Sequence, residues 1–445
     1  MEPIEPWLER QYRHAADALL RSISRTDLVK QRPGFGQTVR AREGAIVASP
    51  VLASYDPDPD YFFHWYRDSA LIIDALRLLH TDGTVGARAP ELLGEFVRFS
   101  GSLLRLDGRT LAVDRSWRAA VAPEFVRFLR TDADLAAAHG EAVAGETRVN
   151  PDGTLDVSGW PRPQYDGPAL RALALLRWAQ ASVPTAADGE GLSALIRFDL
   201  DFTARHWRDP SYDIWEEERG RHYYTLRVAA AALAAGSQWL ARSGDAAQSA
   251  RYAREAEVIG QALDEFWLPA AGYYRSRVLD SGAASAKELD IAVILAAVHT
   301  AVGGAGPHSP HDPRMHATLG RLEALFGQAY AINRKRGDGC GPAMGRYAGD
   351  VYYSGGAYFF STLGAAEFCF RAAAGDGDAA AWIGRGDAYL RTVRAHVPAC
   401  GAMSEQFDQR TGEQTSAKEL AWSYAGLISC VHARRAVTVR SGAGR

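Results

Sequence analysis

The chain has 445 residues, of which 47% are hydrophobic and 23% charged, and its formal net charge at pH 7 is −3. This composition supplies a large buried core and shows no sign of disorder. The charge gives no basic field that would attract nucleic acid or anionic lipid. No apolar run reaches the length of a membrane span. We therefore expect a globular protein that binds neither nucleic acid nor membranes.

The cysteines and histidines show no metal or disulfide pattern. The four cysteines are widely spaced in the last quarter of the chain, without a C-x-x-C motif, and the twelve histidines form no H-E-x-x-H motif. We expect the thiols to be reduced, and we expect neither a metal nor an organic cofactor. The start of the chain lacks the basic segment and apolar core of a signal peptide. These features together favour a cytoplasmic protein.

Apolar residues recur at helical spacing along most of the chain. In chain order, one-sided helices are expected at Pro90–Leu104, Ala119–Leu129, Gly167–Ala179 and Ser193–Trp207, then after the N-cap residues Asp245 and Asp378. Segments that are apolar on nearly every side stand between them at Thr225–Ala235, Ile291–Val302 and Tyr358–Ala374.

A helix without a polar face has to be buried all round, so this alternation predicts two helical layers, one inside the other. Strand-like alternation is limited to short pieces such as Gly272–Val278. The sequence contains no linker, low-complexity block or compositional break. We therefore expect a single all-α domain that covers residues 1–445.

Two adjacent carboxylates, Glu216 and Glu217, directly follow Trp215 on a loop that leads into an alanine-rich helix. Loops at helix ends often carry binding and catalytic residues. A carboxylic acid beside an indole keeps its proton toward neutral pH, because an apolar wall disfavours the charged form. Taken alone, a solvated acidic turn is the commoner meaning of such a sequence.

Four further loops place an aromatic side chain next to a charged or amide group. They contain Tyr61, Trp65, Arg67 and Asp68; Trp160 and Arg162; Arg346 and Tyr347; and Glu405. Aromatic faces with paired hydrogen-bonding groups are what a sugar requires. Each residue also has a structural explanation, such as a helix N-terminal carboxylate for Asp68. Their joint occurrence at four helix ends predicts a carbohydrate site.

These segments resemble the glucoamylases, the inverting α-glucosidases of glycoside hydrolase family 15, and above all the catalytic module of the fungal enzymes. The resemblance runs in family order through residues 61–71, 160–172 and 212–217, then Arg346 and Tyr347 with Tyr352 and Tyr353, and then residues 404–425. It implies an (α/α)6 toroid, the six-hairpin fold, with long active-site loops. Fungal members differ from this chain at His64, Tyr66 and Tyr358.

The resemblance also implies roles. Glu216 would be the general acid and Glu405 the general base, about 6.5–9.5 Å apart across one cleft as in inverting glycosidases. Arg67 and Arg346 near the pocket would help to keep Glu405 and Asp68 charged. The implied substrate-binding residues are Arg67, Asp68 and Arg346 on the terminal glucose, Tyr61 beside the reacting ring, Glu217 on the next sugar, Trp160 and Trp422 as walls, Asp213 near the acid, and the motif members Trp65, Arg162, Trp215 and Tyr347.

The expected function is exo-acting release of β-D-glucose from α-glucans or from malto- and isomalto-oligosaccharides. Two alternatives stay open: a disaccharide phosphorylase of the same fold, in which phosphate replaces the base, and a sugar-binding protein without catalysis. The presence of Glu405 as well as Glu216 counts against both. The preferred linkage and the oligomeric state are not fixed by the sequence.

Overall fold

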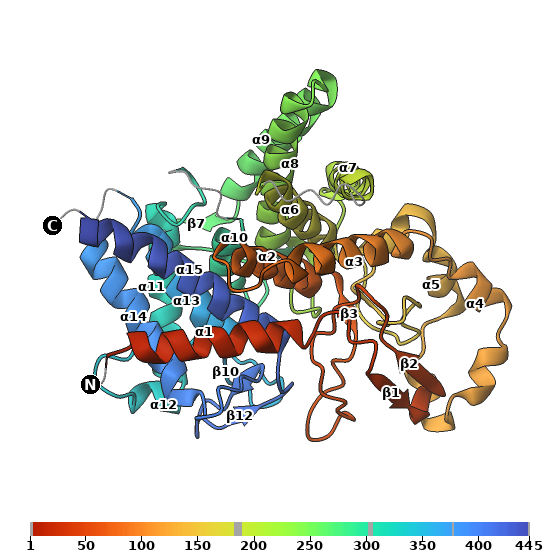
Figure 1. Cartoon of the computed structure of the whole chain (residues 1–445), viewed down its shortest axis with the longest axis horizontal. Coiled ribbons are helices and arrows are strands. Elements are labelled where there is room, and N and C mark those ends of the chain that lie inside the picture. Colours follow the sequence, from red (N-terminus) through yellow and green to blue (C-terminus); the bar gives the residue numbers. More distant parts are fainter. Residues whose placement is uncertain (1–2, 182–188, 301–305, 376–377, 444–445) are drawn as a thin grey trace. The chain divides into compact units, whose positions relative to one another are not determined.

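The computed structural model describes residues 3–181, 189–300, 306–375 and 378–443 (Figure 1). The chain divides into two compact units, each assembled from separate stretches of sequence. The N-terminal unit consists of Leu20–Arg219 and Ala232–Ala253. The C-terminal unit consists of Met1–Leu19, Gly220–Ala231 and Arg254–Arg445. The expectation that residues 1–445 fold as one domain stays a prediction.

Three packed helices organise the N-terminal unit. Helix α6 (Asp166–Gln180) packs against α2 (Tyr66–Thr81) on one side and α7 (Gly189–His206) on the other. The N-terminal ends of α2 and α6 come very close: a Cβ atom on Gly167 would stand 2.6 Å from Cβ of Tyr66. Glycine is therefore needed there, and it lets the first residues of both helices meet.

Short strands hold the loops of this unit. Strand β3 (His64–Trp65) pairs antiparallel with β4 (Arg148–Val149) immediately before α2 begins. Strand β1 (Val29–Arg32) pairs in the same way with β2 (Gln37–Arg40). The β3–β4 pairing fixes the position of Trp65, the last residue before α2.

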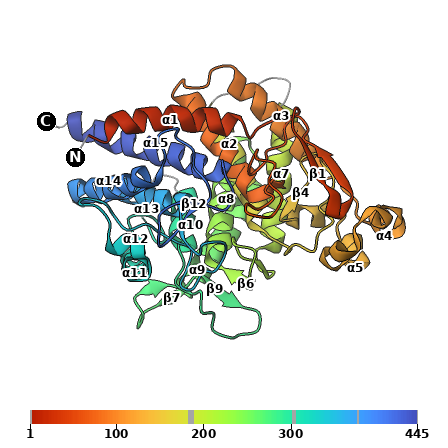
Figure 2. The ribbon, with the colours of Figure 1, turned by 90° about the horizontal axis from the view of Figure 1, so that it is seen from below.

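Helix α13 (Phe359–Ala372) is the centre of the C-terminal unit. It is buried along almost its whole length and packs against α10 (Ala292–His299), α14 (Ala379–His396) and α15 (Ala421–Ala443). Helix α1 (Glu5–Leu20) runs alongside α15 in both views (Figures 1 and 2). Ion pairs from consecutive arginines of α15 to α1, Arg434–Glu5 and Arg435–Glu9, join the two helices.

A small sheet in the same unit carries residues from two of the motifs. Its strands lie in the order β10 (Ala357–Tyr358), β11 (Gln406–Phe407) and β12 (Gln414–Thr415). Tyr358 lies opposite Gln406, and Gln406 lies opposite Thr415. Glu405 directly precedes β11, so the sheet fixes the backbone on which the expected base is carried.

Most of the expected helices are present, and both expected N-caps are found. Asp378 accepts a hydrogen bond from the backbone N–H of Ala381, and Asp245 accepts one from Gln248 before α9 (Ala246–Asp264). The expected helices at 90–104, 167–179 and 193–207 are α3 (Arg88–Leu103), α6 and α7, and the alanine-rich run is α8 (Tyr223–Arg242).

Two expectations were wrong. The segment Ala119–Leu129 is not an α-helix but falls within two 3-10 turns, η2 (Ser116–Ala120) and η3 (Pro123–Phe128), because Pro123 lacks the N–H that an α-helix interior needs. The expected strand at 272–278 is interrupted, giving β8 (Tyr273–Tyr274) and β9 (Arg277–Leu279). The helix expected at 291–302 is α10, and residues 301 and 302 lie outside the described residues.

The remaining elements are η1 (Pro33–Phe35), α4 (Arg109–Val113), α5 (Asp132–Ala137), η4 (Gly140–Gly145), β5 (Ser211–Tyr212), β6 (Arg219–His222), β7 (Trp267–Leu268), α11 (Pro313–Ala329) and α12 (Ala331–Arg334). No helix among the described residues combines the length and the apolar character needed to cross a membrane.

Candidate active site

The loop that carries Glu216 is a tight turn closed on Asp213. Oδ1 of Asp213 accepts hydrogen bonds from the backbone N–H groups of Trp215 (3.1 Å) and Glu217 (2.9 Å). The backbone carbonyl of Asp213 accepts a hydrogen bond from the backbone N–H of Glu216 (2.9 Å). Within this turn Glu216 has a φ of 65°, in the left-handed region. Such a conformation is costly for a residue with a side chain and is concentrated at functional sites. Asp213 therefore shapes the turn that presents Glu216.

The carboxylate of Glu216 is held by three N–H donors. Its Oε1 accepts from the indole N–H of Trp65 (2.9 Å) and from Nη2 of Arg67 (3.2 Å). Its Oε2 accepts from the indole N–H of Trp160 (2.5 Å). Trp65 and Trp160 contact the acid through the polar edges of their indoles. The apolar wall expected from Trp215 stays a prediction. Five of the residues named in advance thus meet in one cluster: Trp65, Arg67, Asp68, Trp160 and Glu216.

Arg67 is the centre of this cluster. Its Nη2 lies 3.1 Å from Oδ2 of Asp68, and its Nη1 donates to Oε1 of Gln164 (3.1 Å) and lies 3.8 Å from Oδ2 of Asp166. Burial raises the pKa of Asp68, and the opposing effect of Arg67 does not reverse this. Arg67 therefore favours the charged form of Asp68, as expected, while removal from water acts in the opposite direction and is the larger effect.

The loop around Trp160 is tied to the turn of Glu216. Nε2 of Gln164 donates to the carbonyl of Asp213 (2.6 Å), and the backbone N–H of Tyr212 donates to the carbonyl of Pro163 (2.9 Å). These bonds join two motifs about fifty residues apart in the sequence. They fix Trp160 and Glu216 in one framework.

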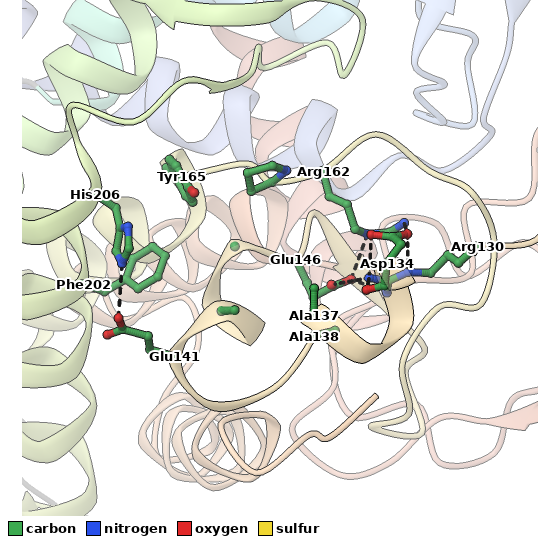
Figure 3. Close-up of a pocket in the computed structure, with 13 residues that line it drawn as sticks. Arg130, Asp134, Ala137, Ala138, Glu141, Glu146, Arg162, Tyr165, Phe202 and His206 are labelled. Atoms are coloured by element: carbon green, nitrogen blue, oxygen red, sulfur yellow. Dashed lines mark hydrogen bonds and ion pairs between the residues drawn. The ribbon is translucent and has the colours of Figure 1, made fainter. Parts of the chain in front are cut away.

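Arg162 from the same loop lies in a neighbouring pocket of about 300 Å³ (Figure 3). Its Nε lies 3.0 Å from Oε2 of Glu146, and Arg130 binds the same carboxylate with both terminal nitrogens. The aromatic side chains of the pocket are Tyr165, Phe202 and His206. In Figure 3 they lie apart from the charged groups of Arg130, Arg162 and Glu146. The described contacts of Arg162 thus hold the loop together; its proposed contact with substrate stays a prediction.

A larger cavity of about 730 Å³ lies beside Trp160. Aromatic rings and arginines dominate its lining: Phe35, Tyr55, Phe63, Phe125, Phe128, Arg32, Arg127 and Arg148. The guanidinium of Arg148 lies 3.7 Å from the centre of the Trp160 ring. Tyr61 packs against Trp65, with ring centres 5.1 Å apart. The indole of Trp160 therefore contacts Glu216 and also borders a cavity whose aromatic and polar groups suit sugars.

In the C-terminal unit, Glu405 is 8% exposed, and its Oε2 accepts a hydrogen bond from the hydroxyl of Ser416. Its backbone N–H donates to the carbonyl of Ala417 (2.7 Å), and its own carbonyl accepts from Phe359 (3.2 Å). Ser416 has a φ of 64°, so a second strained residue supports this carboxylate.

Arg346 is held rigidly in the same unit. Its Nε and Nη2 donate to the two oxygens of Asp350 at 2.7 and 2.6 Å, and Nη2 also donates to the hydroxyl of Tyr347 (3.3 Å). The hydroxyl of Tyr358 donates to Asp350 (3.1 Å) and accepts from Gln406 (2.9 Å). Burial raises the pKa of Tyr358 well above its usual range, so its hydroxyl keeps its proton. Trp422 stacks on Phe360, with ring centres 4.2 Å apart and planes 5° from parallel.

The residue pattern did not single out four side chains that the structure places in these clusters. They are Gln164 and Asp166 beside Arg67, Asp350 on Arg346, and Ser416 on Glu405. Gln164, Asp166 and Ser416 stand inside the stretches that carried the family resemblance, so the motifs contained the signal. Asp350 lies between the two matched pairs of its loop. Among the described residues, no group of three His, Cys, Asp or Glu side chains is arranged to hold a metal ion.

The comparisons with known proteins agree with one another. The model of the glycosyl hydrolases family 15 matches residues 144–383 and 378–432. The probable glucoamylase of Schizosaccharomyces pombe is 30% identical over 434 residues, covering 88% of this chain and 85% of that protein. The intracellular, sporulation-specific glucoamylase of Saccharomyces cerevisiae is 25% identical, covering 98% of this chain and 85% of that protein.

The solved structure of the Hormoconis resinae glucoamylase matches with a TM-score of 0.76 and 25% identity, covering 97% of this chain and 74% of that one. This likeness confirms the expected all-α, (α/α)6 fold class. With the match to the family model and the relative at 30% identity, it identifies the chain as a glycoside hydrolase that belongs to family 15.

Proposed function

We propose that this hydrolase is an inverting, exo-acting α-glucosidase that releases β-D-glucose from the non-reducing ends of short, soluble α-glucans. The observation that carries the proposal is the setting of Glu216, a carboxyl on a strained turn with three converging N–H donors. The solved and curated relatives named as glucoamylases support the choice of α-glucans.

Glu216 acts as the general acid. Its protonated carboxyl gives its proton to the glycosidic oxygen as the bond to the leaving sugar breaks. The carboxylate that remains accepts hydrogen bonds from Trp65, Trp160 and Arg67, which stabilise the charge as it develops. The donors are already in place, so the reaction needs no reorganisation of the site.

Glu405 acts as the general base. The hydroxyl of Ser416 donates to Oε2 of Glu405 and orients the carboxylate, which takes a proton from the attacking water. In an inverting enzyme the water attacks from the face of the sugar opposite to the leaving group. The expected separation of the two carboxyls is about 6.5–9.5 Å, against about 5 Å for a retaining enzyme.

The sugar itself is bound by the surrounding polar and aromatic groups. Arg67 and Asp68, joined by Arg346, hold the hydroxyls of the terminal glucose, and Tyr61 lies beside the reacting ring. Trp160 and Trp422 wall the site, Glu217 contacts the next sugar, and the cavity beside Trp160 takes the leaving part of the chain. A site that accepts only a chain end gives exo-acting cleavage.

The deciding experiment follows glucose release from a panel of glucose disaccharides by NMR. Inversion predicts that the first product is β-glucose, before it mutarotates. Initial α-glucose would contradict inversion, and release that requires phosphate would indicate a phosphorylase. Soluble malto- or isomalto-oligosaccharides should react far faster than raw starch; efficient digestion of starch granules, or internal cleavage to mixed oligosaccharides, would contradict an end-specific site.

We also propose that the enzyme works in the cytoplasm. The four cysteines, Cys340, Cys369, Cys400 and Cys430, are all free thiols, which suits a reducing compartment. One relative is named as intracellular. Fractionation of the producing cells, with activity and antibody detection in each fraction, tests this; recovery from the culture medium would contradict it.

A further inference from the structure

One buried carboxyl beside the candidate acid has no place in the mechanism above. Asp166 is the first residue of α6, and it is completely buried. Within the described part of the chain, neither of its carboxylate oxygens accepts a hydrogen bond. Its ion pair is with Arg67, at 3.8 Å. An ionised carboxylate in such a position is expensive, because burial removes water and nothing replaces it.

The single positive charge of Arg67 cannot balance Asp166 in addition to the other two carboxylates beside it. The same guanidinium lies 3.1 Å from Asp68 and 3.2 Å from Glu216. The three carboxyl side chains are 1–9% exposed. Three buried negative charges around one positive charge would leave a net charge of about −2 in a region of low dielectric constant, so the cluster has to retain at least one proton.

The other charges near Asp166 do not change this balance. From α2 it faces Arg67 and Asp68, and from the turn after β5 it faces Glu216. The next arginine on its own helix, Arg171, is bound through two nitrogens to Asp199 at 2.8 and 2.7 Å. Burial raises the pKa of Asp166 to about 6, against the opposing effect of Arg67.

We propose that Asp166 is a positioning residue that controls the proton of the catalytic acid. In acidic solution Asp166 is neutral, and the charge of Arg67 is left to Asp68 and Glu216. When Asp166 ionises as the pH rises, its negative charge makes the loss of a further proton from the cluster harder. This inference rests on the proposed role of Glu216 as the acid.

The test is the isosteric variant Asp166→Asn, which imitates the neutral carboxyl at every pH. Activity in the acidic range should change less than about threefold, because the wild-type group is neutral there as well. The alkaline limb of kcat/KM against pH should move down by roughly half to one pH unit, the size expected for a nearby like charge. An unmoved alkaline limb would overturn the proposal.

The matched control is Asp74→Asn, the same change on α2 at a carboxyl that pairs with Arg77 (2.7 Å) and Arg177 (2.5 Å). This variant removes a partly exposed ion pair between α2 and α6 and leaves the residues of the cluster around Arg67 unchanged. It should lower stability and leave the alkaline limb in place. A shift equal to that of Asp166→Asn would mean that the effect comes from loosened helices and would overturn the proposal.

A second measurement does not depend on turnover. Infrared difference spectroscopy of the enzyme with ¹³C-labelled aspartate, between acidic and neutral pH, should show a protonated carboxyl that titrates near pH 6 and is missing in Asp166→Asn. Absence of this band in the wild type would overturn the inference even if glucose release is confirmed. Failure to release glucose at any pH, with the band present, would instead contradict the proposed function.

Discussion

The indole nitrogen of Trp160 lies 2.5 Å from Oε2 of Glu216, and the same indole borders the aromatic cavity. One side chain therefore connects the candidate acid to the region where the leaving part of the substrate is expected. Loss of its N–H should impair proton transfer, whereas loss of its ring should impair substrate binding.

Trp160→Phe keeps an aromatic ring and removes the hydrogen bond to Glu216. A hydrogen bond to a charged group contributes about 1.5–3 kcal/mol, so kcat should fall by roughly 10- to 100-fold with a smaller change in KM. Trp117→Phe is the matched control, because the indole of Trp117 donates to the carbonyl of Leu111 in a part of the unit away from Glu216. Equal losses in the two variants would contradict the role of Trp160.

The two proposed proton-transfer residues should be far more sensitive than their neighbour. Glu216→Gln and Glu405→Gln each remove one proton-transfer group, and each should lower kcat by about 10²–10⁴-fold with the fold intact. Glu217→Gln should mainly raise KM. Steady-state kinetics and circular dichroism on the three variants provide the check. If Glu217→Gln were as damaging as Glu216→Gln, the acid would be the other member of the pair.

The turn that presents Glu216 depends on an acceptor at position 213. Asp213→Asn keeps an oxygen that accepts from the N–H groups of Trp215 and Glu217, whereas Asp213→Ala removes this acceptor. We expect Asp213→Ala to lose about 1–3 kcal/mol of stability, since the two hydrogen bonds that close the turn are lost, and most of the activity. Asp213→Asn should retain much more of both. Thermal unfolding and kcat compared across the two variants would reveal whether charge or geometry matters.

Predictions from the sequence were reliable where the signal is local. Helical periodicity and N-cap residues located most of the long helices. The helix wrongly expected across Pro123 failed for a local reason too, the missing N–H of proline, which the apolar spacing concealed. The motif order correctly placed Trp65, Arg67 and Asp68 at the start of α2 and Trp160 in a neighbouring loop.

Contacts between distant parts of the chain could not be predicted in this way. The donors on Glu216 stand 151 and 56 residues away in the sequence, at Trp65 and Trp160. No periodicity indicates whether an indole offers its apolar face or its N–H. The close approach of Asp166 to Arg67 depends on how two helix ends cross at Gly167, which is a matter of packing.

His64 should stay neutral in acidic solution. Burial lowers the pKa of His64 to about 3, and its Nδ1 accepts a hydrogen bond from the backbone N–H of Ile46 (3.0 Å), so the proton is on Nε2. Because the folded pKa is below the unfolded value, this group contributes stability above about pH 6.5 that is lost as the pH falls toward 3. Long-range ¹H–¹⁵N NMR at pH 5 should show a neutral Nε2–H imidazole; an imidazolium would contradict this.

The raised pKa of Asp166 also predicts a pH-dependent gain in stability for Asp166→Asn. Its ordinary value is 3.8 and its folded value is about 6, so its favourable contribution is complete below pH 3.8 and is lost as the pH rises through 6. Asparagine has no such loss. The free energy of unfolding of the variant, relative to wild type, should therefore increase by roughly 2 kcal/mol between pH 4 and pH 7 and then level off.

Asp74→Asn provides a control of opposite sign. Burial opposes the charge on Asp74, but Arg177 and Arg77 outweigh burial and hold its pKa below the usual range. That carboxyl adds stability above its unfolded pKa, so its variant should lose stability relative to wild type as the pH rises from 3 to 5. Urea unfolding at a series of pH values measures the free energy of unfolding of each variant relative to wild type. Any effect of the amide group that does not depend on pH cancels when this difference is followed against pH. A difference for Asp166→Asn that does not change with pH would show that Asp166 is ionised in the folded protein throughout this range.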